Sequence, residues 1–434
     1  MASLEEFIQN IWIMDTHEHT VPEQERISQP ADPLRIFLSH YASSDLISAG
    51  LSVDDYGRSI DLNIPLIERW KIIEPFWLKA QNTAYFNSLK IAAKDIYGIE
   101  EINGGTIEEL SRRMKSMNKS GLYRSILKDR AKIERSIFDG INDIIDVDRE
   151  FFSPVVRLED FIIIRSRENI RSLSLTLKTP IHSLRDLERA LELKVESILD
   201  KIVGFKIALA YKRKIYFEKV TFDDAEKVFN KIISSKDTYV RCTRPDGVRV
   251  TLSDEISIEE GRCLQDHMVH KMLQLASKYT LPVQVHTGIQ EGNLNLVSNS
   301  NPIYLANLFM EYDDVKFDIF HGSYPYTKEL ATIAKNFPNV YADLSWLHIV
   351  SPTSAKEVLR DWLDTIPSNK ILGFGGDYRF VEGIYAHSKM AREDIATVLR
   401  EKVDEGRFSE DEAKLIARII LRDNVLEVFN RVKV

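Results

Sequence analysis

The sequence predicts an α/β protein of the (β/α)8 TIM barrel class, with helical insertions after strands 1 and 4. Three observations predict this fold. Short apolar, β-branched runs recur along the chain, helix-like stretches separate them, and polar side chains able to bind a metal follow several of the runs. The length of 434 residues suits a single barrel domain, 1–434, and 44% hydrophobic residues supply a large core.

Eight apolar runs are expected to form the barrel strands, because eight parallel strands, each followed by a helix, close such a barrel. The runs cover residues 11–16, 132–138, 152–157, 202–210, 282–287, 315–320, 339–343 and 370–376. Between the runs, apolar residues recur at helical spacing. Leu184, Leu187, Leu191 and Ile198 mark such a helix face before the fourth run.

Two connections are too long to be simple strand–helix loops. Residues 20–130, approximately, follow the first run, and residues 212–280, approximately, follow the fourth. Loops that leave the carboxyl ends of barrel strands surround the active site, so both insertions are predicted to be helical caps over the barrel mouth. An independent helical domain is the alternative, but no Gly/Pro/Ser-rich linker separates these segments from the barrel.

Composition and charge exclude several classes of protein. A net charge of −8 argues against a general nucleic-acid binder, and no run of 18 apolar residues is long enough to cross a membrane. Glu5 and Glu6 stand where a signal peptide would be basic, and Cys242 and Cys263 are too few for a disulfide framework. We therefore expect a cytoplasmic protein with a small-molecule substrate and no nucleic-acid or membrane partner.

The first run leads directly into His17-Glu18-His19. Alternation along a strand points the two imidazoles to the same side, where they can bind one Zn²⁺ or a similar ion. Two exposed loop histidines would give the same pattern, so the pair alone leaves both interpretations open.

Three later runs also end in a side chain that can bind a metal. His286 follows the fifth run, His321 the sixth and Asp377 the eighth. Catalytic residues of barrel enzymes occupy the carboxyl ends of the strands. One such histidine would be assigned to hydrogen bonding in the core, whereas four histidines and an aspartate at strand ends indicate a metal centre. A further four histidines are assigned structural or surface positions: His40, His182, His267 and His270.

Lys206 lies in the middle of the fourth run, on the face that it shares with Gly204 and Ala208. This face should point into the barrel, since the opposite face is apolar and suits the helix layer. A buried lysine is costly unless it is paired, neutralised or modified. Carboxylation by CO₂ would let it bridge two cations; the alternative is an ammonium that pairs with Asp377 or with a substrate carboxylate.

The order of these side chains resembles that of the amidohydrolase superfamily: His-x-His after strand 1, Lys after 4, His after 5 and 6, and Asp after 8. The local sequence is similar to the amidohydrolase-related (amidohydrolase 2) group. Within it, the chain resembles the amidohydrolase portion of glutamine-synthetase-like fusion proteins. The segments that carry the resemblance are 204–213, 320–326, 339–346 and 373–377.

The resemblance implies one or two divalent ions, Zn²⁺ or Mn²⁺. His17, His19 and Asp377 would hold one ion, while His286 and His321 would hold a second or orient the substrate. Lys206, if carboxylated, would bridge the two. A homo-oligomer is a further expectation at the level of the family.

Such a site predicts a hydrolase of amides, lactones or esters, because a divalent ion makes hydroxide available near neutral pH. Asp377 would accept and return the proton, and His321 would polarise the scissile carbonyl. Non-hydrolytic decarboxylation or uronate-type isomerisation on the same site is the alternative, and a non-catalytic binding barrel is a third. The candidates for contacting a carboxylate substrate are Tyr211, Arg213, Trp346 and Arg379.

Overall fold

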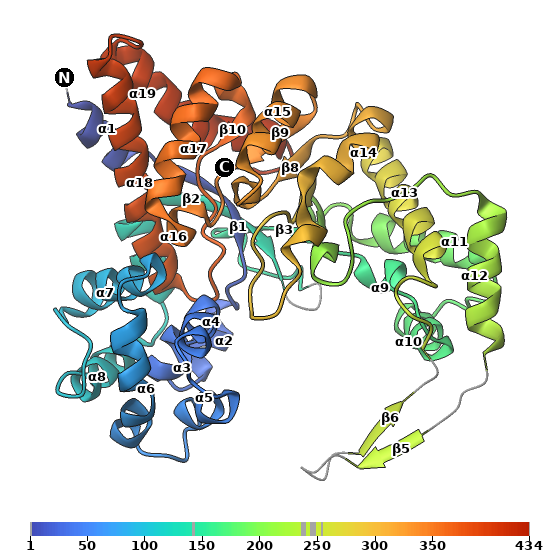
Figure 1. Ribbon diagram of the computed structural model, residues 1–434, viewed down its shortest axis with the longest axis horizontal. Coiled ribbons are helices and arrows are strands. Elements are labelled where there is room, and N and C mark those ends of the chain that lie inside the picture. Colours follow the sequence, from blue (N-terminus) through green and yellow to red (C-terminus); the bar gives the residue numbers. More distant parts are fainter. Residues whose placement is uncertain (1, 141–143, 236–239, 244–248, 253–254, 434) are drawn as a thin grey trace.

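Eight parallel strands form one sheet that curls into a nearly closed barrel (Figure 1). The computed structural model describes residues 2–140, 144–235, 240–243, 249–252 and 255–433. In barrel order the strands are β1 (Ile13–Glu18), β2 (Ile133–Asp139), β3 (Phe152–Val156), β4 (Gly204–Ile207), β7 (Val283–Val285), β8 (Phe317–Ile319), β9 (Val340–Asp343) and β10 (Ile371–Leu372). The predicted barrel and all eight predicted strand positions are confirmed.

The segment after β10 brings the two edges of the sheet together. The amide of Thr16 donates to the carbonyl of Phe374 at 3.0 Å, and the amide of Asp377 donates to the carbonyl of His17 at 2.7 Å. Gly376 makes this approach feasible, because a Cβ at that position would lie 1.7 Å from Oε1 of Glu18. The first and last metal-competent residues of the sequence are therefore neighbours in space.

Helices surround the sheet between its strands. Those between β3 and β4 are α9 (Glu159–Ile162), α10 (Arg167–Leu177) and α11 (Leu184–Ile198). The later ones are α14 (Ala306–Glu311), α15 (Thr327–Asn336), α16 (Leu347–Val350), α17 (Pro352–Thr365), α18 (Val381–Asp404), α19 (Glu410–Arg418) and α20 (Asn424–Val428), and α1 (Leu4–Asn10) precedes β1. Val425, Val428 and Phe429 pack with Met14 and Leu372 in one apolar cluster, so α20 closes the amino end of the barrel. Among the described helices, none has the length and hydropathy needed to span a bilayer.

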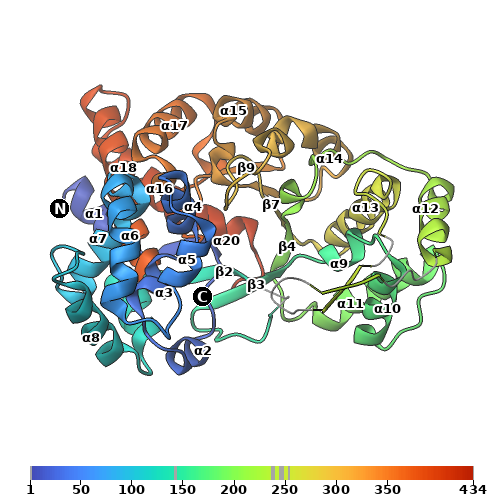
Figure 2. The same cartoon turned by 60° about the horizontal axis from the view of Figure 1, so that its bottom comes forward.

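The first insertion is a helical lobe beside the barrel (blue to cyan in Figures 1 and 2). It contains α2 (Glu23–Ser28), α3 (Pro33–Phe37), α4 (Tyr41–Ser48), α5 (Val53–Ser59), α6 (Leu66–Ala80), α7 (Ala84–Tyr97), α8 (Ile107–Met117) and the π-helix η1 (Arg124–Arg130). Buried polar contacts attach α7 to the barrel. The hydroxyls of Ser88 and Tyr378 are 2.6 Å apart, and that of Tyr97 donates to Glu382 at 2.6 Å.

The second insertion is helical only in part. After the short 3-10 helix η3 (Leu209–Tyr211), it contains α12 (Phe222–Ser234) and α13 (Arg262–Tyr279). Between these helices, the strands β5 (Val240–Thr243) and β6 (Arg249–Leu252) pair antiparallel. This hairpin was not predicted, and it projects away from the barrel in Figure 1.

Arg392 on α18 binds the backbone of two other segments inside the protein. The residue is 3% exposed, and its guanidinium donates to the carbonyls of Ile8, Ile11 and Ala131. Replacing it with methionine, Arg392→Met, is expected to destabilise the fold by about 3–5 kcal/mol, since unsatisfied buried polar groups cost roughly 1–3 kcal/mol each. Thermal unfolding measures the loss. Arg400→Met on the same helix is the control and should change the midpoint little, because Arg400 makes surface ion pairs, with Glu5 and Glu410. Equal losses in the two variants would contradict this role.

Candidate metal centre

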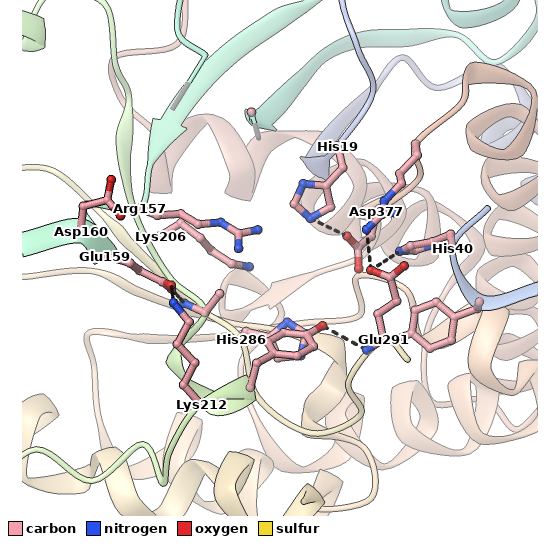
Figure 3. A pocket seen from close by; sticks show the side chains of 15 residues that line it. His19, His40, Arg157, Glu159, Asp160, Lys206, Lys212, His286, Glu291 and Asp377 are labelled. Carbon is pink, nitrogen blue, oxygen red and sulfur yellow. Dashed lines mark hydrogen bonds and ion pairs between the residues drawn. The ribbon is translucent and has the colours of Figure 1, made fainter. Parts of the chain in front are cut away.

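A cavity of about 560 Å³ lies at the carboxyl ends of the barrel strands (Figure 3). Its lining comes from the ends of several strands and from α4 of the first insertion, which is where α/β barrels carry their active sites. The lining residues are His19, His40, Tyr41, Gly140, Arg157, Glu159, Asp160, Lys206, Ala208, Tyr211, Lys212, His286, Glu291, Asp377 and Arg379.

His17 and His19 meet at the end of β1, with their Nε2 atoms 3.1 Å apart. Nδ1 of His19 lies 2.8 Å from the backbone carbonyl of Asp139, which can only accept, so this nitrogen carries the proton. Nδ1 of His17 donates in the same way to Oε1 of Gln284 at 3.3 Å. Burial lowers the pKa of His17 well below its usual value and that of His19 to about 4. Both rings are therefore neutral near pH 7, and two Nε2 lone pairs face each other.

Two carboxylates flank these lone pairs. Oδ2 of Asp139 lies 3.6 Å from Nε2 of His17. Oδ1 of Asp377 lies 3.3 Å from Nε2 of His19 and 3.8 Å from Nε2 of His17. Two imidazole lone pairs 3.1 Å apart repel each other unless a cation lies near both, and the adjacent oxygens complete a donor set typical of a divalent ion. The residues present at this site fit a metal.

His286 and His321, which follow the adjacent strands β7 and β8, form a second pair of the same kind. Nε2 of His286 donates to the carbonyl of Ile289 at 2.9 Å, and Nδ1 of His321 donates to the carbonyl of Ser345 at 3.0 Å. The remaining ring nitrogens, 3.1 Å apart, again present lone pairs to each other. Oδ2 of Asp377 lies 3.9 Å from Nε2 of His321, so the two carboxylate oxygens of Asp377 face the two histidine pairs.

Lys206 lies between these groups with its side chain buried. Among the described residues its Nζ has no hydrogen-bond partner, and it lies 3.4 Å from the centroid of the Phe320 ring. Burial lowers the pKa of this amine to about 8, although Asp139 and Asp377 oppose the shift. The lysine does point into the barrel, and an amine that is partly neutral near pH 8 can react with CO₂.

The structure separates the four candidates for substrate contact. Tyr211 and Arg379 line the cavity. Arg213 does not, because the turn of η3 directs its guanidinium to Asp266 at 2.7 Å and Gln265 at 2.8 Å on α13. Trp346 is fully buried against His40, with ring centroids 4.7 Å apart, and so supports the wall without lining it.

Several residues of the site were not identified in the sequence. The strand end Phe138-Asp139-Gly140 carries an acid after an apolar run, a signal similar to that of Asp377 after the eighth run. Arg157 binds Asp139 through two nitrogens, at 2.7 and 3.0 Å, and lowers the pKa of that carboxyl although burial opposes it. His40, which was assigned no role, lines the cavity 3.7 Å from Glu291. No local pattern identifies His40, since tertiary packing of the insertion brings it to the barrel.

Metal affinity at this centre is expected to rise with pH up to about pH 8. Burial raises the pKa of Asp377 to about 8, while all four histidines have lowered pKa values and stay neutral. Below that pH an ion must displace the proton on Asp377, so the apparent association constant should rise by up to about tenfold per pH unit and then level off. Calorimetry in buffers of different ionisation enthalpy counts the proton released. A pH-independent affinity between about pH 6.5 and 8 would contradict the prediction.

Comparisons with known proteins agree with this fold and site. The family model described as Amidohydrolase matches residues 244–418, which contain His286, His321 and Asp377. Protein fluG of Emericella nidulans is 29% identical over 229 residues, covering 51% of this chain. The matched region spans about a quarter, 25%, of the length of that relative.

Solved structures share the fold over nearly the whole chain. A uronate isomerase of Thermotoga maritima, 16% identical, superposes with a TM-score of 0.78 over 98% of this chain and 96% of its own. A glucuronate isomerase of Caulobacter crescentus, 17% identical, gives 0.78 over 99% and 94%. A Lactobacillus casei protein named as a metal-dependent hydrolase, 17% identical, gives 0.69 over 100% of both chains. Fold and site define a TIM barrel with metal-competent residues at its mouth. Over residues 244–418 the chain is similar to the amidohydrolase family.

Proposed function

We propose that the protein is a metal-dependent hydrolase that cleaves a C–N or C–O bond in an amide, lactone or ester of a small carboxylate-bearing molecule. The observation that carries this proposal is the pair of facing Nε2 lone pairs of His17 and His19, flanked by Asp139 and Asp377. These four residues would hold the ion, and Zn²⁺ suits their nitrogen and oxygen donors. When bound, a divalent ion supplies hydroxide near neutral pH and polarises a carbonyl.

Asp377 is the residue best placed to move a proton. Its side chain lies between the two histidine pairs and lines the cavity, so it can reach both an attacking water and a leaving group. Because a base with a pKa near the working pH both accepts and returns a proton, the raised pKa of about 8 suits this role.

His321 is better suited to binding an ion than to polarising the substrate. Its proton is on Nδ1, where it donates to Ser345, so Nε2 has no hydrogen to offer to a carbonyl oxygen. The side chain is also fully buried. We therefore infer that His321 and His286 bind a second ion, or accept a hydrogen bond from a hydroxyl of the substrate.

The cavity wall supports a substrate that carries a carboxylate. Arg157, whose side chain is 36% exposed, and Arg379, 43% exposed, both line the cavity, and a guanidinium binds a carboxylate through two parallel hydrogen bonds. Tyr211 packs against His286, with ring centroids 4.7 Å apart and the rings tilted by 50°, and can orient the bound molecule.

Incubation in ¹⁸O-labelled water tests the hydrolase assignment. Zinc-loaded protein should convert at least one member of a panel of N-acyl amino acids, lactones and short esters, with one ¹⁸O in the carboxyl product. Protein treated with a chelator should be inactive, and added zinc should restore it. Turnover without ¹⁸O incorporation would contradict hydrolysis.

An aldose–ketose isomerase of uronates, or a decarboxylase, is the second candidate on the same site. Two proteins of the same fold are named as isomerases of uronate and of glucuronate, and the densely polar cavity also suits a hydroxylated acid. Reversible conversion of glucuronate to a ketose, or release of CO₂ without consumption of water, would identify these reactions. Protein that contains no metal as purified, and is unaffected by zinc or manganese, would instead indicate a non-catalytic barrel.

Lys206 is expected to carry a carboxylate when two ions are bound. Native mass spectrometry should show an excess of one CO₂ per chain, and ¹³C-labelled bicarbonate should give a carbamate resonance. Both signals should be absent from Lys206→Met. Full occupancy by two ions without either signal would show that the amine stays unmodified.

A further inference from the structure

A layer of polar side chains lies beneath the metal centre, where a barrel interior is usually filled by branched apolar residues. Gln284 and Asp318 are register partners on β7 and β8, and Asp343 ends β9. All three side chains are fully buried. Burying polar groups costs stability unless their hydrogen bonds are satisfied, so the layer calls for a functional explanation.

The hydrogen bonds of Gln284 fix which way its amide faces. Nε2 donates to the backbone carbonyl of Thr16 at 2.8 Å and to Oδ2 of Asp318 at 3.0 Å. The carbonyl of Thr16 can only accept, so the amide nitrogen must be on that side. Oε1 then faces Nδ1 of His17 at 3.3 Å and must accept its proton.

Asp318 and Asp343 continue the chain of contacts. The carboxyls of Asp318 and Asp343 share a hydrogen bond, and the Thr16 side chain also hydrogen-bonds Asp343. Burial raises the pKa of both carboxyls, so the pair retains a proton. Oδ1 of Asp343 accepts from the amide of Ser345 at 2.7 Å. The carbonyl of Ser345 accepts from Nδ1 of His321. One buried network thus joins a histidine of each pair.

We propose that Gln284 is a positioning residue that holds His17 in the Nδ1–H tautomer and so keeps the Nε2 lone pair directed at the ion. In the other tautomer Nε2 would carry a hydrogen and could not ligate. This inference rests on the proposed metal centre, and the same network gives His321 the matching tautomer.

Three variants test the proposal by competition titration with zinc and a chromophoric chelator. Gln284→Met keeps the length of the side chain but removes the acceptor, and it should weaken binding by about 10–100-fold. Gln284→Glu keeps an acceptor for His17, and with its other oxygen protonated it still donates to the Thr16 carbonyl, so it should recover most of the affinity. Asn424→Leu is the matched control: Asn424 is a buried amide that donates to the carbonyls of Ser368 and Ile371, away from the centre. It should bind zinc within about twofold of the wild type while losing stability.

The outcomes separate this inference from the proposed function. If the wild type binds zinc and Gln284→Met binds it equally tightly, the role of Gln284 alone is overturned. If the wild type binds no zinc, the metal centre itself is overturned. If Gln284→Met fails to fold, long-range ¹H–¹⁵N spectra of the wild-type histidine rings, assigned with His17→Asn, decide the point. A protonated Nδ1 in His17 supports the proposal, and a protonated Nε2 overturns it.

Discussion

Asp377→Asn is expected to lower kcat by about 10²–10⁴-fold while the protein keeps metal, the range that loss of a general acid–base usually costs. The amide cannot accept a proton, but it keeps the shape of the side chain, and its backbone amide still donates to His17. His17, His19 and Asp139 remain to hold the ion. Product formation and metal content, measured on the same preparation, check both parts.

Asp313→Asn is the control for that variant, because Asp313 is an exposed aspartate between α14 and β8, outside the cavity. It should retain the activity of the wild type. Wild-type turnover in Asp377→Asn with the metal in place would remove Asp377 from proton transfer. The pH dependence of metal binding should also be lost in this variant if Asp377 is the group that releases the proton.

His19→Ala should weaken zinc binding by more than the roughly 10–100-fold that loss of a supporting contact costs, because it removes one of two facing lone pairs. Activity should fall in parallel, and high zinc should restore part of it. His182→Ala is the matched control, since His182 is exposed and its ring has no partner in the described structure. Equal zinc affinity in the two variants would show that His19 is not a ligand.

The eight strands could be predicted because each is a short apolar run, and because the segments between the runs have apolar residues at helical spacing. Eight is also the number of strands that such a barrel requires. The hairpin of β5 and β6 carries no such pattern. In the part of the chain that the structure describes, its strands pair with each other and not with the barrel sheet, so the repeat of strand and helix gives no indication of them.

The candidate site could be predicted where a residue lies at the end of its strand or shortly after it, as His17, His286 and Asp377 do. Arg213 shows the limit of that reasoning. Arg213 lies only six residues after Ile207, the last residue of β4. The 3-10 helix η3 lies between them and turns the chain, so that Arg213 contacts α13. His40 shows the opposite case, because a residue far from any barrel strand reaches the cavity through the packing of the insertion.

The protonation states of the site histidines could not be predicted from the sequence, although the proposed function depends on them. The tautomers of His19, His286 and His321 are each set by a backbone carbonyl, which any residue type could supply. Only the three-dimensional contacts show which nitrogen of each ring donates: Nδ1 in His19 and His321, and Nε2 in His286. The other nitrogen of each ring presents a lone pair.

Metal binding by the purified wild-type protein tests the metal centre most directly. Protein stripped with a chelator, dialysed and titrated with zinc against a competing chelator should bind one or two ions per chain, and His19→Ala should lose at least one of them. Zinc binding no stronger in the wild type than in His19→Ala would contradict a metal centre at the end of β1.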